Sequence, residues 1–590
     1  MCGIAGIALR PHQTIKEWQK KALVQALRHR GPDGQGEWTT NTAVLIHTRL
    51  SIVDVEHGKQ PLLNNNQFAT VVNGEIYNDP ELRNLNKNYN FLTKSDSECV
   101  IPLWEKFHEE YTEKLRGMYA VALVDNGRGV VVLSRDPFGI KPLYYTCTDK
   151  GIAFASKPQA LLKAGFAKAK IDFSALSTLL QLQFYSGSNT IFQGIKRLAP
   201  GENLIIKDGE IIKKLQKPVV NFEKRKIFDV KPALDELDEV LTKSVEVHQR
   251  ADVPLGLFLS SGIDSSILLK LMQRLGREKR LCAWTARFET NKEPGGVDES
   301  KQAALLAKEV GAQHHIFSIT QQQVWQYLPQ IVNCMDDPAF DYAIIPTWFL
   351  AKDASQSVKV ILSGEGGDEL FAGYGRYRKV SRPFWLGGKK LYSKPIFYNT
   401  SLLKFSNAQW RNKIRDMEQK SLNFDLTRLT QAQWLDINTW LPDDLLLKLD
   451  RCLMAHGVEG RVPFLDKKVA EFSFRLADTL KINQGKGKWI LRKWLEKNFP
   501  SAEPFAPKQG FTVPIGLWIE QNALTLAPLV AKQQGIKAIF DTTQILKLFE
   551  KASGRKERHM AWNILCYALW HKIYIMGYSP MGSTCELLAA

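Results

Sequence analysis

The stretch LGLFLSSGIDSSILLKLM, residues 255–272, indicates how the larger part of this chain folds. A short apolar run leads into a turn of serine and glycine, and apolar residues then recur at helical spacing. This order predicts a buried strand, a tight turn and a helix. Backbone N–H groups and hydroxyls at such a helix start form a nest for phosphate, although a capped helix after a tight connection has the same appearance.

The same alternation of apolar runs and helical patterns continues after this stretch. LCAWTARF (281–288) and VKVIL (358–362) are short apolar runs, and SKQAALLAKEV (300–310) between them has a helical pattern. Apolar strands that alternate with helices predict an α/β domain with a parallel sheet. Beyond about residue 400 the pattern is mostly helical, and the tail SPMGSTCELLAA (579–590) is expected to be a loose end.

The first 200 residues differ, because short strands such as YAVALVD and GVVVLSR follow one another with frequent turns. This pattern is typical of antiparallel sheet. A polar, lysine-rich stretch at 207–232 then precedes a helical pattern, so we place the domain boundary near residue 215. The expected domains are residues 1–215 and 230–575.

Composition narrows the functional class. The 590 residues include 79 basic and 61 acidic side chains, a formal charge of +18, but the basic residues are scattered. We therefore expect a solvated surface and no nucleic-acid partner. The eight cysteines include no CxxC pair, and no apolar stretch reaches the roughly 18 residues of a membrane span. These features favour a cytoplasmic protein with no membrane partner.

The chain opens MCGIAGIALR (1–10), with a cysteine directly after the first methionine. Removal of Met1 would place a thiol and a free α-amine on Cys2. The amine, with a pKa of about 7.7 to 8.0, can take the thiol proton near neutral pH. Cys2 is therefore a candidate nucleophile that carries its own base, although most lone cysteines are inert.

Other residues of the first half suit an amide substrate. NGEIYN (73–78) offers the Asn73 side-chain amide and the Gly74 N–H as donors for a developing oxyanion. Arg49 could clamp a carboxylate and Asp96 could hold an ammonium. Together they match an α-amino acid whose side chain ends in an amide, whereas each alone is more typical of a surface ion pair or a turn.

A second turn, SGEGGDELFAGYGRY (363–377), carries the carboxylates Glu365, Asp368 and Glu369 after another apolar strand. Oxygen ligands from Asp264 and Asp368 would suit Mg²⁺ that is bound mainly to phosphate and water. A solvated acidic turn is the alternative. The chain lacks GxxxxGK[ST], the main signature of P-loop nucleotide sites. It also lacks a GxGxxG after a strand, the main signature of dinucleotide sites.

Seven segments of the first 145 residues resemble the glutaminase domain of class II glutamine amidotransferases. They are CGIAGI (2–7), HRGPDG (29–34), RLSIVD (49–54), GKQPL (58–62), NGEIYN (73–78), SDSE (95–98) and RDPFGIKPLYY (135–145). The resemblance implies an α+β N-terminal nucleophile hydrolase fold, an αββα sandwich. It implies Cys2 as the nucleophile and Asn73 and Gly74 as oxyanion donors. The implied glutamine-binding residues are Arg49, Leu50, Asn73, Glu75 and Asp96.

The second half resembles ATP pyrophosphatases, because SSGIDS (260–265) is similar to their SGGxDS signature with Ser261 in place of a glycine. KLDRCLMAHGVEGRVPFLD (448–466) and APKQGFTVPIG (506–516) resemble further synthetase signatures. The resemblance implies Glu365 beside the reacting carbonyl and Lys508 beside the departing pyrophosphate. The implied nucleotide-binding residues are Leu259, Ser260, Ser261, Gly262, Asp264, Ser265, Ser363, Gly364 and Tyr374, and the implied metal ligands are Asp264 and Asp368.

Both halves together resemble the glutamine-hydrolysing asparagine synthetase family. The resemblance implies that Cys2 releases ammonia from glutamine, that ammonia crosses a buried passage, and that it attacks a carboxylate adenylated with ATP and Mg²⁺. Aspartate is the expected acceptor; a sugar acid or a peptide carboxylate is the alternative. A tRNA-modifying pyrophosphatase would share the SSGIDS turn and bind tRNA with steep salt dependence, and a non-catalytic binding protein is a third hypothesis. A homodimer is left open.

Overall fold

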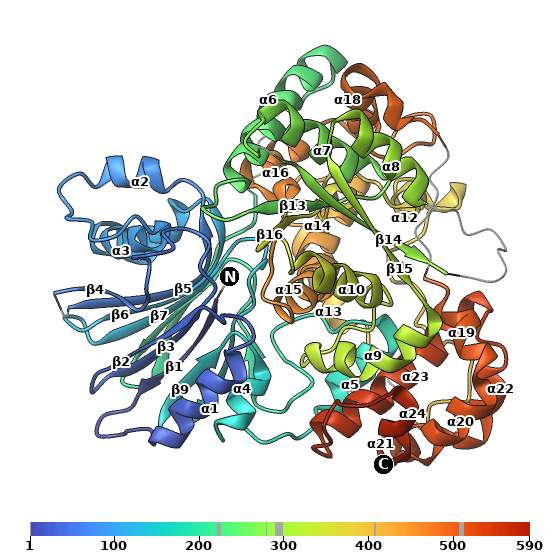
Figure 1. The fold of residues 1–590 in the computed structure, drawn as a ribbon, viewed down its shortest axis with the longest axis horizontal. Helices are drawn as coiled ribbons and strands as arrows, with labels where there is room; N and C mark the ends of the chain where they lie inside the picture. The colour runs from blue at the N-terminus through green and yellow to red at the C-terminus, as the bar shows by residue number, and fades with distance from the viewer. Residues whose placement is uncertain are drawn as a thin grey trace.

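The computed structural model describes residues 2–65, 67–220, 226–278, 280–289, 299–405, 409–506 and 513–590. Figure 1 shows the N-terminal strands stacked on one side of the molecule, with the parallel sheet and most helices on the other. The N-terminus lies at the junction of the two parts. Cys2, the first residue that the structure describes, is therefore close to both parts.

The N-terminal part contains two antiparallel six-stranded sheets, ordered β10-β8-β9-β1-β3-β2 and β12-β11-β7-β6-β5-β4. The first sheet comprises β1 (Gly3–Leu9), β2 (Gly34–Thr39), β3 (Ala43–Arg49), β8 (Tyr144–Thr148), β9 (Gly151–Ala155) and β10 (Ile195–Arg197). The second comprises β4 (Leu62–Asn64), β5 (Phe68–Ile76), β6 (Gly117–Asp125), β7 (Val130–Arg135), β11 (Glu202–Lys207) and β12 (Glu210–Gln216).

Alternating side chains fill the space between these sheets, because successive residues of a strand face opposite sides. Ile4, Leu45, Val71 and Leu133 belong to one buried cluster that joins the two inner faces. The outer faces are covered by α1 (Glu17–Leu27) and α4 (Pro158–Lys163) on the first sheet and by α3 (Val100–Phe107) on the second. The predicted αββα sandwich is confirmed.

The lysine-rich stretch at 207–232 begins in the second sheet. Its first residues form β12, which pairs with β11 over Glu202↔Gln216 to Lys207↔Glu210. Outward-facing lysines suit an edge strand because they discourage pairing with another chain. The boundary near residue 215, and with it the domain limits 1–215 and 230–575, stays a prediction. Within the first of these, α5 (Phe173–Leu182) packs on the second part, where Asn563 Nδ2 donates to Leu180 O at 3.0 Å.

The second part is built on a parallel five-stranded sheet, ordered β15-β14-β13-β16-β17. The strands are β13 (Leu255–Phe258), β14 (Cys282–Phe288), β15 (Gln313–Ile319), β16 (Val360–Leu362) and β17 (Glu459–Arg461). The chain runs outward from β13 through β14 to β15 and then returns to the other side of β13. The carboxyl ends of β13 and β16 therefore flank a topological switch point, where ligands of such sheets bind.

Helices surround this sheet, and the described residues beyond about 400 are mostly helical, as predicted. The helices that contact its strands are α7 (Ile263–Leu275), α8 (Glu299–Glu309), α10 (Ile344–Ala354) and α15 (Leu446–Met454). Packed on other helices are α6 (Val230–His248), α9 (Gln321–Cys334), α16 (Lys467–Arg475) and α18 (Trp489–Asn498). The C-terminal part includes α13 (Asn412–Ser421), α14 (Arg428–Asn438), α19 (Ile515–Gln521), α20 (Ala523–Lys532), α21 (Gln534–Ile539), α22 (Ile545–Phe549) and α23 (Arg555–Tyr574).

The prediction of a loose C-terminal end was wrong. Residues of the tail form α24 (Thr584–Ala589), which buries Leu587 and Leu588. The Ser583 hydroxyl accepts from the Glu586 N–H, and the Glu586 side chain accepts from the Ser583 N–H. This reciprocal pair is the capping box that the spacing of STCE encodes, so the helix start was readable in the sequence.

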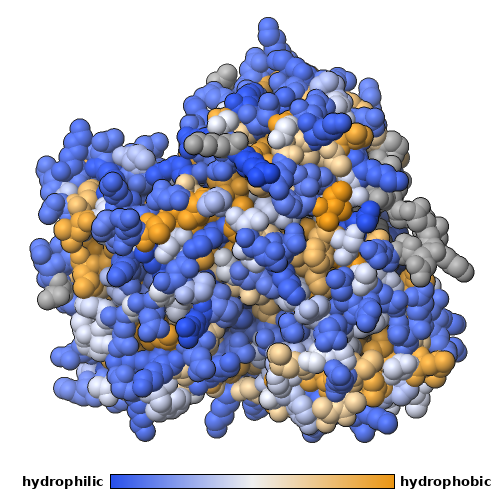
Figure 2. Space-filling view, viewed as in Figure 1, coloured by the Kyte–Doolittle hydropathy of each residue, from blue (hydrophilic) through white to orange (hydrophobic). Residues whose placement is uncertain are grey.

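The face shown in Figure 2 is mostly hydrophilic, with small apolar areas between charged side chains. Across the described ranges, no helix combines the length and the apolar character needed to cross a membrane.

Candidate active sites

Cys2 lies immediately before β1, between the two sheets and the second part of the molecule. It is 8% exposed, and its backbone N–H donates to Asn73 Oδ1 at 3.1 Å. Burial raises the pKa of the Cys2 thiol, whereas a hydrogen bond from the Leu50 backbone acts in the opposite direction. A thiol with a raised pKa needs a base to become a nucleophile, which is the part the terminal amine would take.

Asn73 offers a donor next to this thiol. The side chain is fully buried, and its Nδ2 has no hydrogen-bond partner among the described residues. Because Cys2 N holds Oδ1 of the same amide, the unpartnered NH₂ group is fixed in place. An unpaired buried donor costs about 1–3 kcal/mol, which an arriving oxyanion would offset.

Gly74 follows on β5 where that strand pairs with β6. A Cβ atom on Gly74 would lie 2.0 Å from Met118 O, so no side chain fits there. The glycine keeps β5 against β6 while its backbone stays close to Asn73. Sequence reasoning gave Gly74 as a donor; its packing against β6 was not predictable.

The residues predicted to bind an amino acid gather beside β5. Asp96 is buried, and its Oδ2 accepts from Ile76 N at 2.5 Å. Burial raises the pKa of Asp96 to about 6. Glu75 Oε1 lies 3.2 Å from Arg461 Nη2 of the second part. Arg49 donates to the backbone oxygens of Val55 at 3.0 Å and Asp54 at 2.6 Å, so it supports the following loop.

The serine-rich turn after β13 is organised by its own hydroxyls. Ser265 Oγ donates to Ser260 O at 2.9 Å, and Gly262 N donates to Ser260 Oγ at 3.1 Å. The helix α7 begins at Ile263, so its free N–H groups point into the turn. Ser261 is partly exposed beside them. The arrangement suits the binding of phosphate oxygens.

The turn after β16 meets this first turn closely. A Cβ atom on Gly364 would lie 2.8 Å from Asp264 Cβ, and one on Gly367 would lie 2.4 Å from Asp264 Oδ1. Ser363 N donates to Arg461 O at 2.8 Å, which ties the turn to β17. The two predicted nucleotide-binding turns, separated by about a hundred residues, therefore lie side by side at the switch point.

The two predicted metal ligands, Asp264 and Asp368, both form an ion pair with Lys488. Lys488 Nζ lies 2.5 Å from Asp264 Oδ2 and 2.8 Å from Asp368 Oδ1. The carboxylates thus converge on a point that a positive charge occupies, and the set fits Mg²⁺ whose other ligands are phosphate oxygens and water. The described residues contain no group of three or more His, Cys, Asp or Glu side chains that could hold a metal ion. Lys488 was not predicted, because no motif marks it.

Four further predicted residues, Glu365, Tyr374, Lys508 and Leu259, have different outcomes. Burial raises the pKa of Glu365, which lies 3.7 Å from Lys448 Nζ. Tyr374 donates its hydroxyl to Glu369 Oε1 at 2.6 Å. Lys508 falls outside the described residues. Leu259 is buried at the end of β13, where its N–H donates to Trp284 O at 2.8 Å.

Sequence reasoning also missed the residues that join the two sites. Arg30 is fully buried; its guanidinium donates to Asp450 Oδ2 at 2.8 Å, to Asp450 Oδ1 at 2.9 Å and to Cys2 O at 3.2 Å. Lys141 Nζ donates to Gly460 O at 3.2 Å. Arg30 lies in HRGPDG and Lys141 in RDPFGIKPLYY, so both motifs were quoted, but their partners lie some three to four hundred residues away.

The fold and the sites define a class: an N-terminal glutamine amidotransferase domain of the nucleophile hydrolase type followed by an ATP-dependent synthetase domain. The family model for a glutamine amidotransferase domain matches residues 1–217, and the model for asparagine synthase matches residues 236–572. The chain belongs to the asparagine synthase family.

Relatives match this chain over nearly its whole length. The glutamine-hydrolyzing asparagine synthetase 1 of Bacillus subtilis strain 168 is 32% identical, and the match covers 98% of this chain and 97% of the relative. The asparagine synthetase B of Escherichia coli K12 is 29% identical over 90% of this chain and 86% of the relative. A solved structure of the allosteric regulatory enzyme of purine biosynthesis is 16% identical with a TM-score of 0.29, and the match covers 54% of this chain and 80% of that chain.

Proposed function

We propose that this protein is a glutamine-dependent asparagine synthetase that transfers the amide nitrogen of glutamine to aspartate. The observation that carries the proposal is the Arg30 bridge, because one guanidinium contacts both the Cys2 carbonyl and Asp450 of α15. A glutaminase site joined so directly to the synthetase part suits a shared nitrogen. The names of the relatives, which cover nearly the whole chain, also support it.

In the first site, Cys2 would attack the side-chain amide of glutamine after its amine has accepted the thiol proton. The Asn73 Nδ2 and the Gly74 N–H would stabilise the oxyanion that forms on the amide carbonyl. Asp96 would hold the substrate ammonium, with Glu75, Arg49 and the Leu50 backbone around the rest of the amino acid. Collapse of the intermediate would release ammonia and leave a thioester that water hydrolyses to glutamate.

In the second site, ATP would place its phosphates on the turn that Ser260, Ser261, Gly262 and Ser265 form. Leu259, Ser363, Gly364 and Tyr374 would surround the nucleotide. Asp264 and Asp368 would hold Mg²⁺, which neutralises phosphate charge when bound. The Lys488 ammonium between them would have to move toward phosphate or solvent as that ion enters.

The acceptor carboxylate would attack the α-phosphate of ATP, giving an acyl-adenylate and pyrophosphate. Glu365 would lie beside the reacting carbonyl, and Lys508 would stabilise the departing pyrophosphate. Ammonia would then displace AMP. Transfer through the buried junction keeps ammonia unprotonated and therefore nucleophilic, because water is excluded.

The test is incubation of the purified protein with glutamine, ATP, Mg²⁺ and aspartate, with asparagine, glutamate, AMP and pyrophosphate measured together. We expect all four products from the complete mixture. When ATP is omitted, we expect no asparagine. Glutamate without asparagine would point to another acceptor, such as a sugar acid or a peptide carboxylate. Salt-sensitive binding of tRNA without glutaminase activity would contradict the proposal altogether.

A further inference from the structure

The segment RKVSRPFWLGGKKLYSK, residues 378–394, has a high local concentration of positive charge. Most basic residues are scattered along the chain, but this segment carries six of them and no acidic residue. They are Arg378, Lys379, Arg382, Lys389, Lys390 and Lys394, and all six are exposed. In the part of the chain that the structure describes, none of the six forms an ion pair. The proposed activity gives this charge no role.

The middle of this segment is a closed loop. It follows α12 (Gly375–Val380), and Lys389 N donates to Lys379 O at 3.2 Å where the loop returns. A Cβ atom on Gly388 would lie 2.1 Å from Arg382 O, so only glycine fits at the turn before this contact. Backbone contacts at its base therefore fix the shape of the loop.

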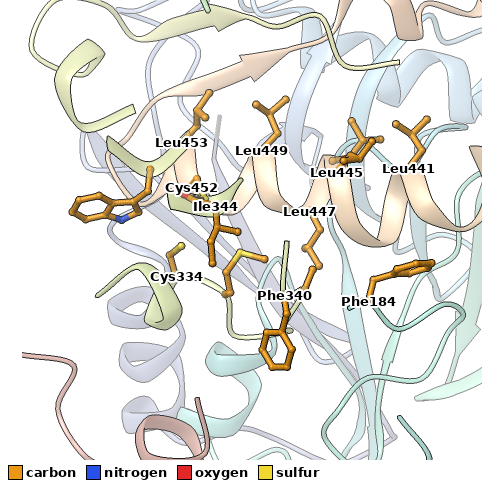
Figure 3. Close-up of a cluster of buried hydrophobic side chains, with 14 of the residues drawn as sticks. Phe184, Cys334, Phe340, Ile344, Leu441, Leu445, Leu447, Leu449, Cys452 and Leu453 are labelled. Carbon is orange, nitrogen blue, oxygen red and sulfur yellow. Dashed lines mark hydrogen bonds between the residues drawn. The ribbon is translucent and has the colours of Figure 1, made fainter. Parts of the chain in front are cut away.

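The residues that follow the loop are anchored in the core. Leu391 is buried, and the Tyr392 hydroxyl donates to Asp436 Oδ1 at 2.7 Å. The ring centroids of Tyr392 and Phe184 are 5.9 Å apart in an edge-to-face arrangement. Figure 3 shows Phe184 among the buried apolar side chains around the helix that carries Leu441. The loop therefore projects from a well-packed base.

Two large apolar side chains occupy the tip of this loop. Trp385 and Leu386 belong to the 3₁₀ turn η3 (Phe384–Leu386) and are 84% and 63% exposed. Adjacent large apolar side chains in water are unfavourable, and such groups often mark interaction sites. Tryptophan is enriched at the interface between membrane and water, because its ring is apolar and its N–H group is polar.

A cavity of about 660 Å³ lies beside the returning part of the loop. Its basic lining residues are Lys389, Lys390, Arg415 and Arg428, and its acidic ones are Asp416 and Glu418. Glu418 Oε1 is already paired with Arg411 Nη2 at 2.6 Å. The cavity therefore has an excess of positive charge, which suits the phosphate of a lipid head group.

We propose that residues 378–394 bind the surface of a membrane that contains anionic phospholipid. Trp385 and Leu386 enter the boundary between head groups and acyl chains, and the surrounding lysines and arginines bind lipid phosphates. The expectation of no membrane partner followed from the absence of a spanning stretch, and peripheral binding needs no such stretch. This contact gives the protein a location and does not depend on the proposed activity.

Charge and shape favour this partner over three others. A second copy of the chain would bring two sets of six positive charges together, which opposes association. A nucleic acid would pair with the cations and stack on Trp385, but it would leave Leu386 in water. A folded acidic protein would need a pocket for the protruding pair, whereas a lipid interface adapts to it. An anionic membrane satisfies the charged and the apolar side chains together.

The first experiment measures sedimentation of the full chain with phospholipid vesicles. We expect binding to vesicles of phosphatidylcholine and phosphatidylglycerol in equal parts, and none to phosphatidylcholine alone. Raising NaCl to about 1 M, where the Debye length is about 3 Å, should weaken binding at least 10-fold. Binding to neither kind of vesicle, or equal binding to both, would overturn the proposal. Binding to duplex DNA or RNA in place of vesicles would also overturn it.

Two double variants separate the apolar contribution from the charged one. Each lysine near an anionic surface contributes about fivefold to binding, so Lys389→Ser with Lys390→Ser should bind the mixed vesicles about 25-fold more weakly. Trp385→Ser with Leu386→Ser removes the inserted side chains and should bind at least about 10-fold more weakly. Glutamine hydrolysis should be unchanged in both variants, which shows that the fold is intact.

Matched controls remove the same groups elsewhere. Leu524→Ser is the apolar control, because Leu524 is 77% exposed and has no lysine or arginine within seven residues. Lys87→Ser with Lys106→Ser removes two exposed charges from the first part of the chain. Both controls should bind like the unmodified protein. Equal losses in the controls and in the loop variants would show that this segment is not the binding surface.

Trp385→Phe tests the insertion itself. Vesicles whose acyl chains carry bromine should quench part of the tryptophan fluorescence of the unmodified protein. Trp385→Phe should still bind these vesicles but lose that quenching, because phenylalanine keeps the apolar contact without the fluorophore. Equal quenching in the two proteins would place Trp385 outside the membrane and contradict the proposal.

Discussion

At the scale of single residues, the site depends on polar atoms that the fold leaves without partners. The Asn73 amide illustrates this, because Cys2 N occupies its oxygen and leaves its nitrogen free. The sequence indicated Asn73 as a donor from its motif alone. The orientation of the amide follows from a contact across 71 residues and was not predictable.

Asn73→Ala removes one proposed oxyanion donor. Losing such a donor typically costs about 10²- to 10³-fold in kcat, so glutamine hydrolysis should fall by that factor. Synthesis driven by added ammonium chloride should stay within twofold of the unmodified protein. Asn84→Ala, at an exposed position, is the control. A hydrolysis rate within threefold of the control would exclude Asn73 from the oxyanion site.

The pH dependence of glutamine use should report Asp96. Its folded pKa is raised to about 6, so the carboxyl group becomes neutral as the pH falls through 6 and can no longer pair with the substrate ammonium. We expect kcat/KM for glutamine to fall tenfold per pH unit below about pH 6, while the circular dichroism spectrum is unchanged. A flat profile between pH 7 and 5 would contradict this role.

At the scale of elements, local patterns were predictable and spatial neighbours were not. Residues 255–272 form β13, a turn and α7 as expected, because apolar periodicity and small turn residues act locally. The chain order gives no direct sign that β16 returns beside β13. The position of Lys488 between Asp264 and Asp368 depends on that return of the chain. No sequence motif could therefore identify Lys488 as part of the site. The capping box of α24 is different, since its signal was present and was overlooked.

Gly364→Ala tests the close approach of the two turns. Its Cβ would meet Asp264 Cβ at 2.8 Å, so one turn must shift. Overpacking of this kind costs about 1–3 kcal/mol, and we expect a lower melting temperature and a KM for ATP at least fivefold higher. Gly127→Ala is the control, because its Cβ would meet only side-chain ends, Gln67 Nε2 at 3.3 Å and Asp125 Oδ1 at 3.4 Å. An unchanged KM for ATP would mean that the turns do not share the nucleotide.

At the scale of the whole molecule, α15 is common to both sites. Lys448 on this helix faces Asp341 and Glu365, and Asp450 two residues later binds Arg30 beside Cys2. The Glu75–Arg461 pair makes a second link between the parts, and Arg461 O binds the turn at Ser363. The family resemblance predicted a passage between the sites, whereas these contacts became visible only in the folded chain.

Asp450→Asn leaves the buried Arg30 without its charged partner. Breaking a buried pair costs about 3–5 kcal/mol, so the free energy of unfolding should fall by that amount. We also expect ammonia to escape from the junction into solvent, so that more than one glutamate forms per asparagine. The exposed variant Glu239→Gln, which removes a surface pair with Lys243, should change neither quantity. Unchanged stability and one-to-one products in Asp450→Asn would show that the bridge has no coupling role.

The most direct measurement compares glutamine with ammonia as the nitrogen source in Cys2→Ala. The account predicts that asparagine synthesis from glutamine disappears, while synthesis from ammonium chloride, ATP and aspartate continues at the rate of the unmodified protein. Equal loss of both activities, or synthesis from glutamine without the thiol, would contradict the division of labour between the two sites.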